Sequence, residues 1–301
     1  MKTIDTIQNF AASLGCPAQR DVPMKNYTSF KIGGPADLFL MPKNEEQVSG
    51  IASFCAENGT PVFVLGKGSN ILVSDSGIRG AVIFTGGLNS VEMTDSLSIK
   101  AGSGLSLMQL CNFALENSLS GLEFAFGIPG TAGGAAFMNA GAYGGEMKDV
   151  LVSCSHVDMR GMCGVLGGEK LDLSYRHSAY EDNGFIITSA AVRLEKGEKE
   201  QIKEKMYGFL ARRKEKQPLE FPSAGSTFKR PQGYFAGALI EQCGLKGTSI
   251  GGAQVSEKHA GFVINRGGAT ADDVLRLVEL VAQTVEKETG VKLEPEIRFI
   301  G

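Results

Sequence analysis

Residues 61–73 have the sequence PVFVLGKGSNILV, and this stretch decides which fold classes the chain can adopt. Two apolar runs flank the glycine loop Gly66–Asn70, and each is typical of a short buried strand. A dinucleotide-binding βαβ unit would place a helix directly after such a loop and a third glycine where this chain has Ile71. A Walker A loop also fails, because Lys67 is followed by glycine rather than by Ser or Thr. The order strand, glycine loop, strand therefore excludes both of these phosphate-binding folds.

Apolar spacing predicts five helices elsewhere in the chain. They are expected from Asn44 to Gly59, from Ser106 to near Gly121, within 195–216 up to Pro218, near 236–243, and from Thr270 to Gly290. The predicted apolar faces are Val48, Ile51, Ala52 and Cys55; Leu107, Leu110, Cys111 and Ala114; Ile202, Met206, Phe209 and Leu210; and Val274, Leu277, Val278, Val281 and Val285.

Strands are predicted between these helices. Residues 81–104 and 150–194 are expected to form short strands and turns, the second region ending in a buried apolar strand at 184–192, and 293–300 is expected to be a final strand. Short strands mixed with separate helices are typical of α+β domains rather than of one doubly wound sheet.

Composition excludes several classes of protein. Lys and Arg total 30 against 33 Asp and Glu, so the net charge is −3, which argues against a general nucleic-acid binder. No apolar run approaches the roughly 20 residues that cross a bilayer, and the polar residues of the start argue against a secretory signal. We therefore expect a cytoplasmic protein.

The cysteines and histidines do not have metal-ligand spacing. The six cysteines form no CxxC pair and the three histidines form no HExxH, so no metal is expected. Scattered cysteines in a cytosolic protein are expected to be reduced thiols that mostly fill the core. They are Cys16, Cys55, Cys111, Cys154, Cys163 and Cys243.

The 40 glycines gather in a few short loops, of which 127–146 is the densest. Such loops let backbone N–H groups approach a ligand closely. Taken alone, they indicate either a phosphorylated ligand or tight turns between strands.

Six motifs in a fixed order narrow this choice. Along the chain they are 28–36 (TSFKIGGPA), Gly66–Asn70, 127–146 (GIPGTAGGAAFMNAGAYGGE), 175–178 (YRHS), 224–229 (AGSTFK) and the tail 293–301. Together they resemble the UDP-N-acetylenolpyruvoylglucosamine reductase family over nearly the whole chain, from about residue 20 to 301.

The resemblance implies a fold and a domain organisation. It implies a two-part vanillyl-alcohol-oxidase-type FAD-binding fold followed by a smaller α+β substrate-binding domain. The expected parts are 1–85 together with a C-terminal strand 297–301, then 86–197, then the substrate-binding domain 198–296.

The resemblance also implies where FAD binds. The loop residues Gly66, Lys67, Gly68, Ser69 and Asn70 are expected at the pyrophosphate, with Gly68 as a phosphate-facing backbone position. A second contacting segment is Gly127, Ile128, Pro129, Gly130, Thr131, Ala132, Gly133 and Gly134. Asn139 and Ile187 are expected to approach the flavin.

Three catalytic residues follow from the same resemblance. Ser226 is expected to give a proton to the substrate carbon, while Arg176 and Glu296 stabilise the intermediate. An arginine suits a carboxylate that gains charge, because its fork donates two parallel hydrogen bonds. On the residues alone, Ser226 would be a turn residue and Arg176 a surface ion-pair partner.

Substrate contacts are predicted at Arg213, Lys229 and His259. The longer members of the family have Asn at the position of Arg230 and an inserted loop whose Tyr covers the substrate. This chain lacks that insertion and resembles the shorter class.

The predicted function is NADPH-dependent reduction of UDP-N-acetylglucosamine enolpyruvate to UDP-N-acetylmuramate through FAD, in peptidoglycan and cell wall synthesis. Two alternatives are another FAD-dependent oxidase or dehydrogenase of the same fold, and a non-enzymatic flavin-binding module. The expected partners are the small-molecule substrate and NADPH, with no nucleic acid, membrane or obligate protein partner.

Overall fold

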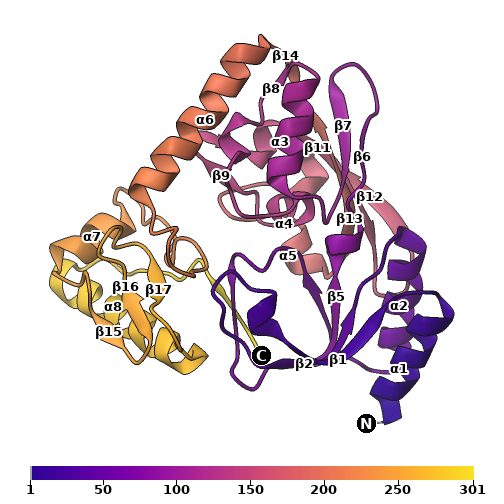
Figure 1. Ribbon diagram of the computed structural model, residues 1–301, viewed down its shortest axis with the longest axis horizontal. Coiled ribbons are helices and arrows are strands. Elements are labelled where there is room, and N and C mark those ends of the chain that lie inside the picture. Colours follow the sequence, from indigo (N-terminus) through magenta and orange to yellow (C-terminus); the bar gives the residue numbers. More distant parts are fainter. Residues whose placement is uncertain (1) are drawn as a thin grey trace. The chain divides into compact units, whose positions relative to one another are not determined.

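The computed structural model describes residues 2–301, which divide into two compact units. Each unit is assembled from segments that are far apart in the sequence (Figure 1). The first contains the residues up to Asp21, Asp37–Lys67 and Gly80–Arg212, and the second contains Val22–Ala36, Gly68–Arg79 and Arg213–Gly301. The three-part division with boundaries after residues 85 and 197 stays a prediction.

The helices begin and end largely where local signals predict. Asn44, Ser106 and Thr270 each cap a helix by accepting a hydrogen bond from a backbone N–H of its first turn. The α-helices are α1 (Lys2–Ser13), α2 (Glu45–Glu57), α3 (Leu107–Glu116), α4 (Ala132–Phe137), α5 (Tyr180–Asn183), α6 (Lys199–Lys216), α7 (Ala236–Gln242) and α8 (Ala271–Thr289). Short 3₁₀ helices are η1 (Met24–Asn26), η2 (Thr85–Gly87), η3 (Glu123–Ala125), η4 (Met147–Asp149) and η5 (Gly168–Leu171).

The first unit contains most of a four-stranded sheet and all of a five-stranded sheet. The four-stranded sheet has the order β1-β2-β5-β3, from β1 (Ala18–Pro23), β2 (Pro35–Leu40), β5 (Ile78–Phe84) and β3 (Val62–Leu65). The antiparallel five-stranded sheet has the order β12-β11-β13-β7-β6, from β12 (Cys163–Gly167), β11 (Leu151–Val157), β13 (Ile186–Arg193), β7 (Ser98–Gly102) and β6 (Val91–Met93). Two-residue strands form the pairs β9 (Gly141–Ala142) with β10 (Gly145–Glu146) and β8 (Leu119–Ser120) with β14 (Glu195–Lys196).

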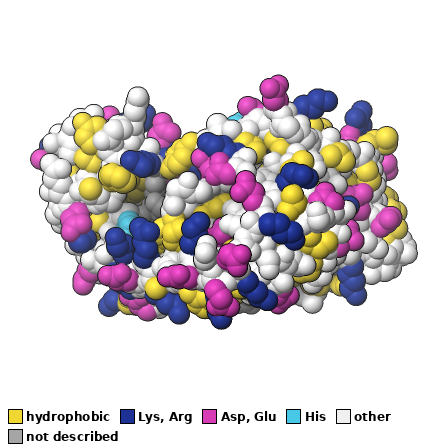
Figure 2. All heavy atoms as spheres, turned by 90° about the horizontal axis from the view of Figure 1, so that it is seen from above, with side chains coloured by type: hydrophobic (Ala, Val, Ile, Leu, Met, Phe, Trp, Pro, Cys, Tyr) yellow, Lys and Arg dark blue, Asp and Glu magenta, His cyan; other side chains and the backbone are white. Residues whose placement is uncertain are grey.

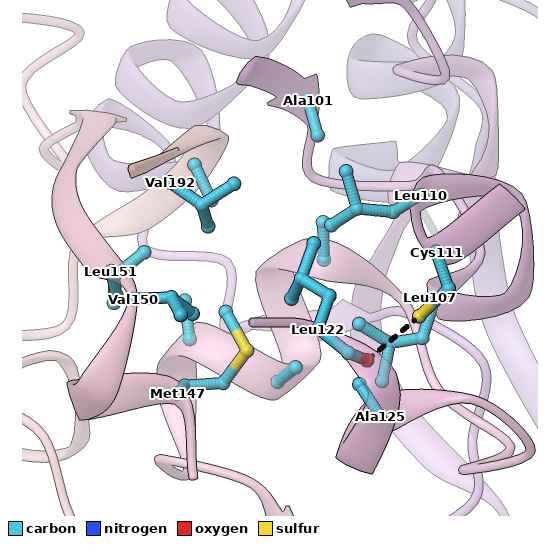
Figure 3. Close-up of a cluster of buried hydrophobic side chains, with 14 of the residues drawn as sticks. Ala101, Leu107, Leu110, Cys111, Leu122, Ala125, Met147, Val150, Leu151 and Val192 are labelled. Atoms are coloured by element: carbon cyan, nitrogen blue, oxygen red, sulfur yellow. Dashed lines mark hydrogen bonds between the residues drawn. The ribbon is translucent and has the colours of Figure 1, made fainter. Parts of the chain in front are cut away.

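One hydrophobic core of the first unit lies between the five-stranded sheet and the helices α3 and α4. Figure 3 shows Leu107, Leu110 and Cys111 of α3 in the same buried cluster as Ala101 and Val192 of the sheet. The Cys111 thiol donates to the Leu122 carbonyl at 3.3 Å. The burial of this thiol raises its pKa to about 12, so it is an unreactive part of the core.

The second unit is smaller and centres on the long helix α8. This helix packs on β15 (Ser249–Ile250) and β16 (Ala253–Val255), which form an antiparallel sheet with β17 (Val263–Asn265). Its predicted apolar face is buried throughout, and Gly290 ends the helix in the left-handed conformation at φ +73°. A separate parallel pair joins β4 (Ile71–Val73) to β18 (Arg298–Ile300), so the last strand lies beside the strand that follows the glycine loop.

Three predictions about elements were wrong in detail. The run after Pro61 is not a buried strand, because β3 is at the edge of its sheet and Val64 is 37% exposed. The helix opened by Ser106 ends at Glu116 rather than near Gly121, since Ser118 turns the chain at φ +55° into β8. The final strand covers only β18, because the residues before it pair with a different segment, as described below.

Four of the six cysteines are buried, as expected for core residues, whereas Cys163 is exposed and Cys243 is half-buried. On the face shown in Figure 2, Lys and Arg side chains are mixed with Asp and Glu. None of the helices formed by residues 2–301 is long and apolar enough to cross a membrane.

Candidate active site

The glycine loop has open backbone amides. Within residues 2–301, the N–H groups of Gly68, Ser69 and Asn70 donate no hydrogen bond to protein, whereas the Gly68 carbonyl accepts one from the Ser29 N–H at 3.0 Å. The carbonyl bond fixes the loop and leaves its donors available. Successive amides of this kind form a concave surface for phosphate oxygens. These residues therefore fit a pyrophosphate-bearing cofactor such as FAD, and the contact itself stays a prediction.

The reason for glycine at position 68 differs from the predicted one. Gly68 has φ +63°, and a Cβ there would lie 2.2 Å from the Tyr27 carbonyl oxygen. That side of Gly68 therefore faces the backbone of residues 27–28 and not an open ligand space. The prediction overlooked this contact because Tyr27 is distant in the sequence.

Alanine at position 68 should abolish flavin binding and destabilise the loop. The control is Gly59→Ala, since Gly59 has nearly the same φ (+62°) but no atom within 4 Å of a new Cβ. Both variants lose about 1 kcal/mol of unfolding free energy to the backbone conformation, and only Gly68→Ala adds a clash. Flavin absorbance per protein and urea denaturation measure the two effects. If Gly68→Ala kept full flavin occupancy and lost no more stability than Gly59→Ala, the predicted role of this loop in FAD binding would be contradicted.

In the second predicted cofactor segment, Gly127–Gly134, most backbone N–H groups donate hydrogen bonds to other groups of the protein. Gly130 donates to the Ile128 carbonyl at 2.9 Å, Gly133 to the Ser103 carbonyl at 2.9 Å, and Gly134 to the Thr131 hydroxyl that caps α4 at 3.2 Å. Gly133 serves close packing, because a Cβ at this position would lie 2.5 Å from Ser103 Cβ. Most backbone N–H groups of this segment are therefore already used within the protein. The predicted contacts of the segment with FAD stay predictions, including those of Gly127, Pro129 and Ala132.

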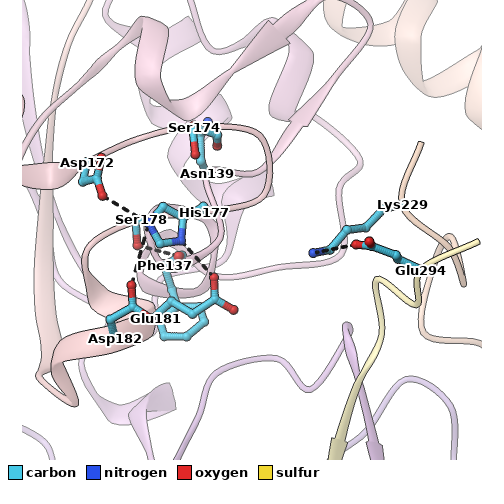
Figure 4. A network of polar contacts seen from close by, with 10 residues as sticks. All are labelled: Phe137, Asn139, Asp172, Ser174, His177, Ser178, Glu181, Asp182, Lys229 and Glu294. Carbon is cyan, nitrogen blue, oxygen red and sulfur yellow. Dashed lines mark hydrogen bonds and ion pairs between the residues drawn. The ribbon is translucent and has the colours of Figure 1, made fainter. Parts of the chain in front are cut away.

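Asn139 is a fully buried connector between two loops. Its side-chain NH₂ group donates to Glu146 Oε2 at 2.6 Å and to the Ser174 carbonyl at 2.8 Å, and its side-chain oxygen accepts from the Lys148 N–H at 2.8 Å. Figure 4 shows Asn139 beside Ser174. With these bonds Asn139 holds the turn that carries Arg176. The predicted approach of Asn139 to the flavin stays a prediction.

Arg176 lies at the tip of a strained turn. Ser174 and His177 exchange two backbone hydrogen bonds of 3.2 Å around it, and Arg176 has φ +57°, which is uncommon for a residue with a side chain. Its guanidinium donates to the Gly141 carbonyl at 3.3 Å and lies over the Tyr175 ring at 4.9 Å. Such a conformation costs of order 1–3 kcal/mol and persists where its surroundings enforce it, commonly at functional sites.

Ile187 lies in the buried part of β13, opposite His156 of β11. The His156 ring is 3.0 Å from the Tyr180 hydroxyl and stacks on Phe185. Burial lowers the pKa of His156, which keeps the imidazole neutral at pH 7. Ile187 is therefore a buried apolar position in β13, and its contact with the flavin stays a prediction.

Ser226 and Glu296 lie on neighbouring segments of the second unit. The Glu296 N–H donates to the Thr227 carbonyl at 2.8 Å, and Phe228 pairs with Pro295. Asn70 of the glycine loop is joined to the same place, since its side chain donates to the Glu296 carbonyl at 3.2 Å and its own carbonyl accepts from Arg298 N–H at 3.0 Å. Hydrogen bonds of Asn70, Glu296 and Thr227, the neighbour of Ser226, thus bring three predicted site residues together.

The Ser226 hydroxyl donates to the Phe228 carbonyl at 3.2 Å, a long bond that a rotating hydroxyl can leave. Gly225 precedes it at φ +80°, and Thr227 follows as the anchor, accepting from the Val263 N–H at 2.9 Å. Ser226 is therefore a half-buried hydroxyl on a firmly held segment.

The predicted substrate residues Arg213, Lys229 and His259 are also in the second unit. Arg213 is buried on α6 and donates to Gln217 Oε1 at 3.1 Å, and Lys229 lies 3.9 Å from Glu294 (Figure 4). His259 Nδ1 accepts from the Gly261 N–H at 3.1 Å, so its proton is on Nε2, and burial lowers the pKa of this histidine. Their contacts with substrate stay predictions.

The structure places Arg176, Asn139 and Ile187 in the first unit, and Ser226, Glu296 and Asn70 in the second. Sequence reasoning gave no role to His177, whose ring lies 3.1 Å from Glu181 Oε2. The i,i+4 spacing of this pair was the available signal. Among residues 2–301, no group of three or more His, Cys, Asp or Glu side chains is placed to hold a metal ion.

Two family descriptions match separate parts of the chain. Residues 36–167 match the "FAD binding domain" family, and residues 217–300 match "UDP-N-acetylenolpyruvoylglucosamine reductase, C-terminal domain". At full length, the UDP-N-acetylenolpyruvoylglucosamine reductase of Clostridium novyi is 51% identical over 283 residues, covering 94% of this chain and 92% of that protein.

Solved structures agree with these matches. The crystal structure of UDP-N-acetylenolpyruvylglucosamine reductase from Thermus caldophilus has a TM-score of 0.83 at 36% identity, covering 95% of this chain and all of the other. A berberine bridge enzyme variant has a TM-score of 0.50 at 14% identity, covering 65% of this chain and 44% of the other, and shows a shared fold alone. The predicted α+β fold class with an FAD-binding fold is confirmed. The chain belongs to the UDP-N-acetylenolpyruvoylglucosamine reductase family.

Proposed function

We propose that this chain reduces UDP-N-acetylglucosamine enolpyruvate to UDP-N-acetylmuramate with NADPH, through FAD, in peptidoglycan synthesis. The observation that carries the proposal is the family membership over 94% of the chain. The reaction class is an FAD-dependent oxidoreduction, and the open amides after Lys67 fit the cofactor's pyrophosphate.

When bound, FAD supplies the hydride that adds to the vinyl carbon of the enolpyruvyl ether. The residues of this chain handle the charge and the proton. Negative charge then develops on the substrate carboxylate, and Arg176 can donate two parallel hydrogen bonds to it. The strained turn fixes the direction of this fork before the substrate arrives, so little reorganisation is needed in the transition state.

Ser226 delivers the proton in this proposal. Its hydroxyl leaves the Phe228 carbonyl and gives its proton to the substrate carbon next to the one that received the hydride. In this proposal Glu296 shares a proton with the anionic intermediate, because a bare carboxylate would repel the negative charge. Because both residues are on paired segments, their spacing is set by backbone hydrogen bonds and not by flexible side chains alone. Arg213, Lys229 and His259 are proposed to contact the diphosphate or uridine end.

We also propose a cytoplasmic location, since NADPH and a nucleotide-linked sugar are water-soluble metabolites. The proposed partners are these two small molecules.

The test uses the visible spectrum of the purified protein under anaerobic conditions. The protein should be yellow, should bleach with NADPH, and should recover its absorbance when the enolpyruvyl substrate is added. Rapid recovery with oxygen in the absence of that substrate would indicate an oxidase of the same fold. A yellow protein that NADPH does not bleach would indicate a flavin-binding module without this activity.

A further inference from the structure

The turn that carries Arg176 is tied down at several points (Figure 4). Asn139 holds the Ser174 carbonyl, and Ser174 and His177 are joined by two backbone bonds. On the other side, the Ser178 hydroxyl donates to the Phe137 carbonyl at 2.5 Å. A residue with a side chain keeps a left-handed conformation only where its surroundings over-determine it. These ties are therefore what keeps Arg176 in its strained conformation.

The His177 side chain also connects the turn to its surroundings, and its imidazole ring can gain or lose a proton near neutral pH. Its Nδ1 lies 3.1 Å from Glu181 Oε2 on α5, and its Nε2 lies 3.3 Å from Asp172 Oδ2 at the end of η5. Only the protonated ring can donate to both carboxylates, because a neutral imidazole carries one N–H. Loss of the proton would turn a ring nitrogen lone pair toward one carboxylate and release one end of the turn.

We propose that His177 is a positioning residue for Arg176, and that the protonated ring holds the turn in the conformation from which the guanidinium can bind the substrate carboxylate. This rests on the proposed function, in which Arg176 stabilises the charge on that carboxylate. His177 does not touch the substrate in this account, and it acts only through the turn.

The charges around the ring determine the sign of the pH dependence. Asp172 from η5 and Glu181 and Asp182 from α5 face the ring, the last at 4.0 Å, while Glu146 acts electrostatically on Arg176 from the neighbouring hairpin. The hydrogen bond to Glu181, followed by that to Asp172, raises the pKa of His177 above its ordinary 6.5. The protonated ring, which holds the turn, is therefore fully populated at low pH and is lost as the pH rises through the raised pKa of His177.

The experiment measures two half-reactions of the holoenzyme by stopped-flow between pH 6 and 9. In the native protein, reoxidation of the reduced flavin by the enolpyruvyl substrate should slow by roughly 10-fold or more as His177 deprotonates, since small misplacement of a catalytic group has effects of this size. In His177→Gln the reoxidation rate should no longer depend on pH in this way. At every pH it should equal the low rate that the native protein has at high pH. Reduction by NADPH should be unchanged in both proteins.

Glu181→Gln provides the matched variant, because it keeps the side-chain shape and removes the main cause of the raised pKa. The fall in rate should move to lower pH. An unmoved fall in Glu181→Gln, or a native-like fall in His177→Gln, would overturn the inference, as would equal slowing of both half-reactions in His177→Gln. If His177→Gln does not fold, Glu181→Gln decides alone. Failure of the native protein to turn over the enolpyruvyl substrate at any pH would instead refute the proposed function.

Discussion

Alanine at position 226 should slow flavin reoxidation by the enolpyruvyl substrate by about 10²–10⁴-fold, the range expected for loss of a general acid. Reduction of the flavin by NADPH should keep its native rate, because Ser226 takes no part in that step. The variant should fold, since the hydroxyl makes only the 3.2 Å bond to the Phe228 carbonyl, which is worth about 0.5–1.5 kcal/mol.

The control for this prediction is Ser223→Ala, in the same loop. The carbonyl of Ser223 accepts from the Ser29 hydroxyl at 2.6 Å, and this backbone bond survives the substitution. Ser223→Ala should therefore have native rates in both half-reactions. Stopped-flow absorbance measures each half separately. Equal slowing of both halves in Ser226→Ala would indicate that the turn is only structural, and native reoxidation would mean that the proton comes from another group.

Cysteine at position 226 should restore part of the rate lost in Ser226→Ala. A thiol has a similar shape and a pKa of about 8.5, so it is a stronger acid than an alcohol. Reoxidation in Ser226→Cys should therefore be faster than in Ser226→Ala. A cysteine variant no better than alanine would argue against an acid at this position.

Lysine at position 176 should not rescue the function of the arginine. Lysine keeps the charge but loses the two-pronged geometry that matches a carboxylate. Turnover with the enolpyruvyl substrate should fall by roughly 10²-fold or more, as for removal of an oxyanion-hole donor. The matched control is Arg193→Lys, an exposed arginine 3.7 Å from Asp95, which should keep native turnover. Native turnover in Arg176→Lys would refute the assigned role.

The same position offers a test on stability. Asparagine tolerates the left-handed conformation better than arginine, so Arg176→Asn should not lower the free energy of unfolding although it abolishes turnover. Thermal unfolding and steady-state rates measure the two effects. A clear loss of stability in Arg176→Asn would mean that the guanidinium contacts stabilise the fold and that the strain has no link to function.

The sequence predicts those features that depend on near neighbours. Asn44, Ser106 and Thr270 cap their helices because each cap bonds to an N–H three residues along. The exposure of Val64 could not be predicted, because it depends on which strand lies beside β3. Contacts between residues that are distant in the sequence could not be predicted at the candidate active site either. The Tyr-Arg-His-Ser motif is visible in the sequence, but its support by Asn139, 35 residues before Ser174, is not.

The conformation at Gly68 illustrates the limit most directly. The glycine-rich loop is predicted to bind a phosphate, whereas the contact that requires glycine at position 68 is with Tyr27, on a segment about 40 residues earlier. The glycine pattern of the sequence indicates that Gly68 matters, and the structure shows the steric reason for glycine there.

The parallel pairing of β18 with β4 has a consequence for synthesis of the chain. Ile71 pairs with Arg298, about 230 residues later, so the strand after the glycine loop has no partner until nearly all of these residues have been translated. At 5–20 residues per second this interval is roughly 10–45 s. Throughout it Asn70 also lacks its bonds to Glu296 and Arg298. With the proposed FAD contacts at Gly66–Asn70, a nascent chain should therefore retain FAD only after residues 298–300 have been translated and have left the ribosome.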